Sequence, residues 1–248
     1  MTTIIGIDCA TQEDKVGIAL GAMDEASCRI EDALVCTKER TLERTVTQWI
    51  PKTGRVLLAL DAPLGWPMPM GIALKEHAAG LPISGSGNCL FRRETDRFIK
   101  TTTGQQSLDV GADRIARTAV AALTLIQSLR EALGEPIPLA WTPTFSARVA
   151  AIEVYPAATL KVRGISPKGY KTTQEVEARR RIISSMREEI EITADVGVLE
   201  RYPDALDAGV CVCAAMDFLS DNAVQPRDQS LAAKEGWIWV RRAQLPRR

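Results

Sequence analysis

Short apolar runs separated by polar turns open the chain and predict three successive strands. The runs are TIIGIDCA, KVGIALGAMD and CRIEDALVCTK. Three short strands in succession favour an antiparallel meander. The next segment, 41–50, repeats apolar residues at helical spacing, and RVLLALDA then returns to a strand pattern. Because a strand, a helix and a strand imply a right-handed crossover, we expect the fourth strand to pair in parallel.

The pattern changes in the middle of the chain. Residues 64–110 are rich in Pro, Gly, Ser and Thr, and a helical repeat follows at about 113–132. Residues 64–148 therefore lack the pattern of the core strands. We expect this segment to be an insertion within a single domain that spans residues 1–248.

Core-like elements return after the insertion. RVAAIEVYPAATL predicts a buried strand, and PDALDAGVCVCAAMDFL predicts a buried helix that is apolar or small on nearly every face. Between them lies a charged helix whose arginine run, 179–181, is typical of a solvated face. GWIWV predicts a last short strand. The predicted fold class is α/β: a mixed sheet with an antiparallel meander and parallel strands, flanked by helices, with a helical and loop insertion.

Charge and hydropathy limit the class of protein. Lys plus Arg and Asp plus Glu each number 31, so the formal net charge is zero. This argues against a surface coated with positive charge, although a local basic groove stays open. No signal peptide is evident, and no apolar run approaches the roughly 18 residues of a membrane span. We expect a cytoplasmic protein without a membrane partner, and the oligomeric state cannot be predicted from the sequence.

Cysteine and histidine spacing gives no indication of a zinc site. None of the six cysteines forms a C-x-x-C pair, and His77 is the single histidine. Buried free thiols in a reducing compartment are the simplest interpretation.

Acidic residues end three of the predicted strands. IIGID ends in Asp8, LLALD ends in Asp61, and VAAIEV carries Glu153 near its end. The C-terminal ends of parallel strands lie along one sheet edge, where open α/β sheets bind ligands. Each acid alone is also typical of a turn or a helix cap. Three acids in the same position favour a shared site.

The last predicted helix adds Asp204 and Asp207, which share a face because they are three residues apart. Pro203 and the helix dipole explain Asp204, but not Asp207, whose neighbours have a buried pattern. Clustered carboxylates need protons or cations to coexist, and oxygen-only ligands favour Mg²⁺ or Mn²⁺. Two such ions about 4 Å apart can clamp a phosphoryl group for in-line displacement.

These motifs resemble known families. Three strands, a helix and a strand, with the acids named above, resemble the RNase H-like superfamily, and the final-helix pair is most similar to that of Holliday-junction resolvases. A wider string of motifs resembles the predicted RNase H-like nucleases grouped as domain of unknown function 429. These motifs are GIDCA, LDAPLGWP, RRETDR, IEVYPAATLK, GYK, DALDAG and EGWIWV. The resemblance spans nearly the whole chain and implies a metal-dependent nuclease acting on DNA or RNA.

The resemblance also implies roles for the acids. Asp8 would bridge both ions, Asp61 would share one, and Asp207 or Asp204 would share the other. Glu153, in the EVYP motif, would be either a ligand or a residue behind the ligands, and both alternatives stay open. The implied catalytic set is therefore Asp8, Asp61, Glu153 and Asp207.

Basic residues near these motifs are candidates for binding substrate phosphates. Arg93 and Arg97 are four residues apart in RRETDR, and Lys171 follows the Glu153 strand. Arginine suits bidentate phosphate contacts. The two arginines could instead pair with the neighbouring acids of the same motif, Glu94 or Asp96.

Two other functions stay open beside a phosphodiesterase acting on nucleic acid. An actin-like ATPase or phosphotransferase shares the core, and GIDCATQ resembles its phosphate-binding hairpin, but the chain is short for two such domains and lacks a clear adenosine motif. A degenerate domain that only binds nucleic acid or protein is the non-enzymatic alternative. The neutral net charge also leaves a small nucleotide substrate open.

Overall fold

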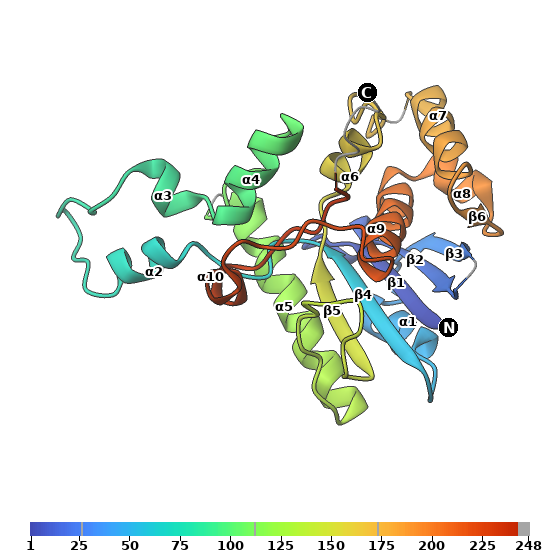
Figure 1. Ribbon diagram of the computed structural model, residues 1–248, viewed down its shortest axis with the longest axis horizontal. Helices are drawn as coiled ribbons and strands as arrows, with labels where there is room; N and C mark the ends of the chain where they lie inside the picture. The colour runs from blue at the N-terminus through green and yellow to red at the C-terminus, as the bar shows by residue number, and fades with distance from the viewer. Residues whose placement is uncertain (26, 112, 173, 243–248) are drawn as a thin grey trace.

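The computed structural model describes residues 1–25, 27–111, 113–172 and 174–242. Six strands form one open mixed sheet in the order β5-β4-β1-β2-β3-β6 (Figure 1). The strands are β1 (Thr2–Asp8), β2 (Gly17–Met23), β3 (Cys28–Val35), β4 (Arg55–Asp61), β5 (Val149–Glu153) and β6 (Glu191–Ile192). The first three pair antiparallel, whereas β4 pairs parallel to β1 and β5 pairs parallel to β4. The predicted α/β class, with a meander followed by parallel strands, is confirmed.

The central strands are apolar throughout because both faces of the sheet are covered. One face, with Ile4 and Leu57, packs against α9 (Pro203–Leu219). The other face, with Ile5 and Leu58, packs against α1 (Leu42–Trp49) and α5 (Asp113–Leu133). Helix α5 belongs to the predicted insertion, so part of that segment contributes directly to the core.

Two glycines set how closely α9 approaches the sheet. A Cβ atom at Gly6 would lie 2.1 Å from the carbonyl oxygen of Ala208, and one at Gly17 would lie 1.9 Å from that of Asp204. Any side chain at these positions would push the helix away from β1 and β2. The absence of a side chain in the GID motif therefore brings the acidic end of α9 down onto the end of β1.

The other helices pack against one another or against α9. They are α2 (Met68–Leu74), α3 (Gly87–Phe91), α4 (Glu94–Thr103), α6 (Pro156–Val162), α7 (Val176–Met186), α8 (Val196–Arg201) and α10 (Gln229–Glu235). Helices α2 and α3 lie on an excursion that projects away from the sheet (Figure 1). The predicted GWIWV strand makes only an isolated bridge, in which Ile238 pairs with Glu153. Among the described residues, no helix combines the length and apolar character that a bilayer crossing requires.

Candidate metal centre

Three of the predicted acidic ligands meet at one point. Asp8 and Asp61 are register partners at the ends of the parallel strands β1 and β4. Asp207 reaches the same point from α9 and is 0% exposed. One carboxylate oxygen from each residue lies within 4.8 Å of the other two. Carboxylate groups from residues up to 199 positions apart in the sequence therefore form a compact, oxygen-only cluster.

The clustered carboxylates strongly perturb one another. Burial raises the pKa of Asp8 well above its ordinary value, and the charges of Asp207 and Asp61 raise it further. Burial also raises the pKa of Asp61 to about 7, although the positive charge of Lys171 opposes this shift. Two neighbouring carboxyl groups whose pKa values are both raised hold a proton between them more readily than isolated ones. At neutral pH the metal-free site therefore retains a proton that a cation would replace.

Asp204, the other predicted ligand on α9, lies outside the three-carboxylate cluster. Its backbone carbonyl packs over Gly17, and its side chain lines the same cavity as Asp8 and Asp61. Burial raises the pKa of Asp204, and the charge of Asp207 adds to this shift. In this conformation Asp204 contributes negative charge to the cavity but is not one of the converging carboxylates.

The GYK motif supplies two direct partners of Asp207. The Tyr170 hydroxyl donates to Asp207 Oδ1 at 2.5 Å, and the Lys171 ammonium lies 2.5 Å from Asp207 Oδ2. Burial and the Asp207 charge raise the pKa of Tyr170, so its hydroxyl keeps its proton and acts as the donor. Sequence reasoning proposed Lys171 as a phosphate-binding residue and missed Tyr170, whose only sequence signal was its place in the motif.

A buried arginine holds this loop in place. Arg179 is 1% exposed and donates to the carbonyl oxygens of Tyr170 and Thr172 at 2.6 and 2.7 Å. The expected solvated face is therefore wrong for Arg179, although Arg180 and Arg181 are exposed. The signal was present in the helical spacing, because 179, 182, 183 and 186 share one buried face of α7.

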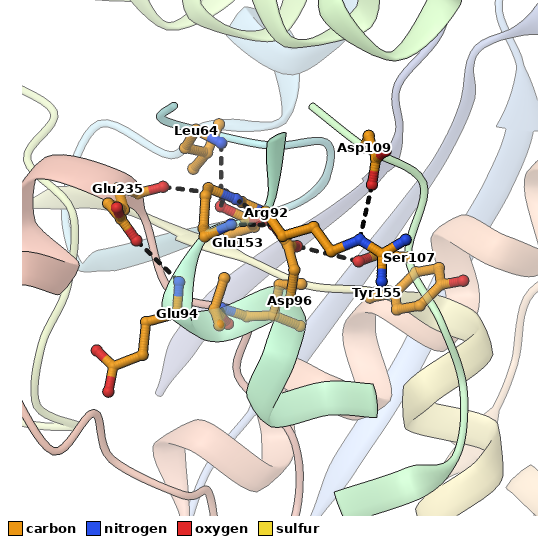
Figure 2. A network of polar contacts seen from close by, with 12 residues as sticks. Leu64, Arg92, Glu94, Asp96, Ser107, Asp109, Glu153, Tyr155 and Glu235 are labelled. Atoms are coloured by element: carbon orange, nitrogen blue, oxygen red, sulfur yellow. Dashed lines mark hydrogen bonds and ion pairs between the residues drawn. The ribbon is translucent and has the colours of Figure 1, made fainter. Parts of the chain in front are cut away.

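Glu153 belongs to a buried ion-pair network beside the cluster (Figure 2). Its carboxylate accepts two hydrogen bonds from Arg93, at 2.7 and 2.8 Å, and one from the Leu64 backbone N–H at 3.0 Å. Leu64 lies three residues after Asp61, so the network fixes the loop that leaves β4. Glu153 therefore lies behind Asp61, among protein donors, and is not one of the three converging carboxylates.

The two predicted phosphate-binding arginines have other roles in this structure. Arg93 is 1% exposed, and its guanidinium donates to Asp96, to Glu153 and to the carbonyl oxygen of Glu235. It has no donor left for a phosphate, so the substrate-binding interpretation of Arg93 is corrected and the pairing with Asp96 is confirmed. Arg97 is exposed, donates to the Arg92 carbonyl oxygen at 2.6 Å and is not among the residues that line the cavity.

The Glu235 carboxylate binds both ends of the excursion that contains α2 and α3. Glu235 Oε1 accepts from the Met68 N–H at 2.7 Å. Glu235 Oε2 accepts from the Glu94 N–H at 2.8 Å (Figure 2). These two amides stand at the beginning and the end of the excursion, so α10 holds both of its ends against the body of the protein.

A cavity of about 670 Å³ opens over the carboxylates. Asp8, Asp61 and Asp204 line it on one side. Other lining residues come from segments far apart in the chain, and they include Lys15, Arg93, Leu108, Arg114, Glu153, Tyr155 and Lys171. The arrangement places a cluster able to hold a divalent cation within reach of a small anionic ligand.

The model of a family described as "Protein of unknown function (DUF429)" matches residues 6–230, which include all three converging aspartates. A comparison with curated proteins finds no match.

Proposed function

Since this chain belongs to the DUF429 family, whose function is unknown, we propose from its own chemistry that it is a metal-dependent phosphodiesterase that cleaves nucleic acid. The observation that carries the proposal is the convergence of Asp8, Asp61 and Asp207 within 4.8 Å at the end of a parallel strand pair. Membership of the RNase H-like superfamily is part of the proposal. The meander, the parallel β4, and acids on β1, β4 and α9 support it.

The residues present fit Mg²⁺ or Mn²⁺. The cluster offers only carboxylate oxygens, which these hard cations prefer. Asp207 Oδ2 is buried, and its one partner within the described residues is itself a cation, the Lys171 ammonium. The proton shared by Asp8 and Asp61 marks a second position where positive charge is needed. Asp8, Asp61 and Asp207 would hold the cation or cations of the proposed site.

Other residues of the chain hold the proposed metal ligands in position. When bound, the ions generate a hydroxide-like nucleophile near neutral pH and stabilise charge on the phosphoryl group. Tyr170 fixes the orientation of Asp207 through a hydrogen bond to Oδ1. Glu153 fixes the loop after Asp61 through the Leu64 amide. Lys171 has an exposed stem and an ammonium at the cluster, so it is placed to contact a phosphoryl oxygen of the substrate.

The test is cleavage of a broad panel of nucleic acids by the purified full chain. Single-stranded, duplex and branched DNA and RNA are incubated with Mg²⁺, Mn²⁺ or excess chelator. We expect cleavage that needs the metal and is abolished in Asp8→Asn and Asp61→Asn, because each change removes a ligand. Asp14→Asn is the matched control, since Asp14 is an exposed aspartate that does not line the cavity.

Two results would reject the proposal. One is cleavage that persists in excess chelator or in both ligand variants. The other is the absence of cleavage of every substrate by a protein whose stability is unaffected by Mn²⁺, which would favour a degenerate binding domain.

A further inference from the structure

The cavity over the carboxylates has three chemically distinct parts. Its acidic side carries Asp8, Asp61 and Asp204. Among the other lining residues, we call Leu108, Ile115 and Tyr155 the apolar wall and Lys15, Arg114 and Lys171 the cationic rim; Arg93, Asp96 and Glu153 also line the cavity but pair with one another. A ligand that satisfied all three parts would carry a phosphate for the metal held at the acidic side, an apolar planar or aliphatic group for the wall, and additional negative charge for the rim.

The apolar wall contains one exposed residue, Leu108, and two half-buried ones, Ile115 and Tyr155. The Leu108 side chain is 55% exposed although it lines a polar cavity. The Tyr155 hydroxyl is held at both sides, because it accepts from Gln105 Nε2 at 3.3 Å and donates to the Gln106 carbonyl oxygen at 3.2 Å. A ring fixed in this way, beside an exposed leucine, suits contact with a nucleobase.

The cationic rim has free capacity for an anion. Among the described residues, Arg114 has neither an ion pair nor a side-chain hydrogen bond, and it stands in the first turn of α5. Lys15 likewise lies at the mouth, on the exposed turn that follows β1. Together with Lys171, these residues give three cations to a phosphate-bearing ligand.

Size and charge argue against an extended duplex footprint. A volume of about 670 Å³ falls within the roughly 300–1,000 Å³ of small-molecule pockets. Strongly salt-dependent duplex binders make about 6–10 phosphate contacts, whereas this rim offers three cations on a chain of zero net charge.

We propose that the cavity accommodates a single nucleotide unit, either at the free end of a strand or in a dinucleotide, with its base against the Tyr155–Leu108 wall and a flanking phosphate at Arg114. This inference rests on the proposed phosphodiesterase function and names its substrate class. Water adds to the phosphorus beside the carboxylates, the ester P–O bond breaks, and the leaving oxygen takes up a proton. The products are a nucleoside monophosphate and a shortened strand, or two mononucleosides of which one carries the phosphate.

The first test compares the same single strand in linear and covalently closed circular form, as DNA and as RNA, with Mn²⁺. We expect the linear strand to be shortened to mononucleotides and the circle to stay intact, because a circle has no free end. A dinucleotide assayed under the same conditions shows whether the bound nucleotide comes from the end of a strand or from a dinucleotide. The dependence of log affinity on log salt for a non-cleavable linear strand should have a slope of about −2, from three cations.

The second test asks whether Arg114 of the cationic rim binds the substrate. Arg114→Ala should raise KM for the linear strand about tenfold, as expected for loss of one charged hydrogen bond, with kcat little changed. Arg117→Ala is the matched control, because Arg117 is exposed on the same helix and does not line the cavity. Both positions are exposed, so neither change should affect folding.

Three outcomes would overturn the inference. Cutting of the circle at a rate close to that of the linear strand, or a salt slope steeper than about −4, would reject the single-nucleotide cavity while leaving the phosphodiesterase in place. Equal KM values for the two arginine variants would reject the role of Arg114. Failure to cleave these three probes and every other substrate of the panel, by a protein whose stability is unaffected by Mn²⁺, would reject the proposed function itself.

Discussion

Replacing Asp61 with asparagine should stabilise the metal-free protein, and by more at pH 8 than at pH 5. The folded state raises the pKa of Asp61 from an ordinary 3.8 to about 7. A carboxyl group with a raised pKa contributes stability that is fully present below pH 3.8 and is lost as the pH rises through about 7. Asparagine does not titrate, so the variant avoids that loss.

The magnitude follows from the size of the shift. About three pKa units at about 1.4 kcal/mol each set a ceiling of about 4 kcal/mol for the free energy of unfolding at pH 8. The cavity admits water to Asp61, and the proton is shared with Asp8, so we expect about 1–2 kcal/mol in the variant. The wild type should lose this amount between about pH 4 and pH 8, whereas Asp61→Asn should stay nearly flat across the part of that range that Asp61 controls.

The assay is urea unfolding of both proteins at pH 5, 6, 7 and 8 in excess chelator, with Asp14→Asn as the control that should follow the wild type. Saturating Mn²⁺ should reverse the order of stability. Wild type gains about 2.7 kcal/mol at a hundred times the dissociation constant, and Asp61→Asn gains much less.

The opposite pattern would refute this reasoning. If Asp61 were an ordinary turn residue, Asp61→Asn would lose about 0.5–2 kcal/mol at every pH, as for a lost cap. A wild type unaffected by Mn²⁺ would complete that refutation.

Other consequences of the site can be measured separately. Mn²⁺ affinity should fall as the pH drops below about 7, because the ion replaces the proton shared by Asp8 and Asp61. Calorimetry in buffers of different ionisation enthalpy should detect the release of that proton. An affinity that does not depend on pH would contradict this. Arg93→Ala should lower the free energy of unfolding by about 3–5 kcal/mol in urea titrations, since it leaves two buried carboxylates unpaired. The exposed control Arg97→Ala should lose less than about 0.5 kcal/mol. Equal losses would show that the network is not stabilising. Tyr170→Phe should cost about 1–3 kcal/mol in the same titrations, because a buried carboxylate oxygen loses its donor, and an unchanged midpoint would argue against that hydrogen bond.

The strands that form the centre of the sheet were predictable because burial on both faces leaves a continuous apolar run. The order of strand, helix and strand predicted that β4 pairs in parallel with the meander. Asp8 and Asp61 were predicted because they are the last residues of β1 and β4. Strand β6 has two residues and no sequence pattern of its own, so its pairing depends on tertiary structure. GWIWV has strand-like composition but forms only an isolated bridge, because Ile238 meets the edge strand β5 at its last residue, Glu153, while Leu139 pairs with Ala151 farther along that edge.

The site was only partly predictable, for a different reason. Asp207 stood out because a charge lay among buried neighbours. The partner of Arg93 could be read locally as Asp96, but its second partner, Glu153, is 60 residues away and only the fold brings it close. The hydrogen bond from Tyr170 to Asp207 likewise joins a loop to a helix 37 residues later, and no periodicity records such a contact.

Anomalous diffraction from crystals of the full chain soaked in Mn²⁺ tests the central claim most directly. The account predicts manganese bounded by the carboxylates of Asp8, Asp61 and Asp207, with oxygen ligands at about 2.1 Å, close to the distances of a hard divalent cation. It also predicts the loss of that peak in Asp61→Asn. Saturating Mn²⁺ that leaves the three carboxylates without a peak, and Lys171 still paired with Asp207, would contradict the metal site and the phosphodiesterase built on it.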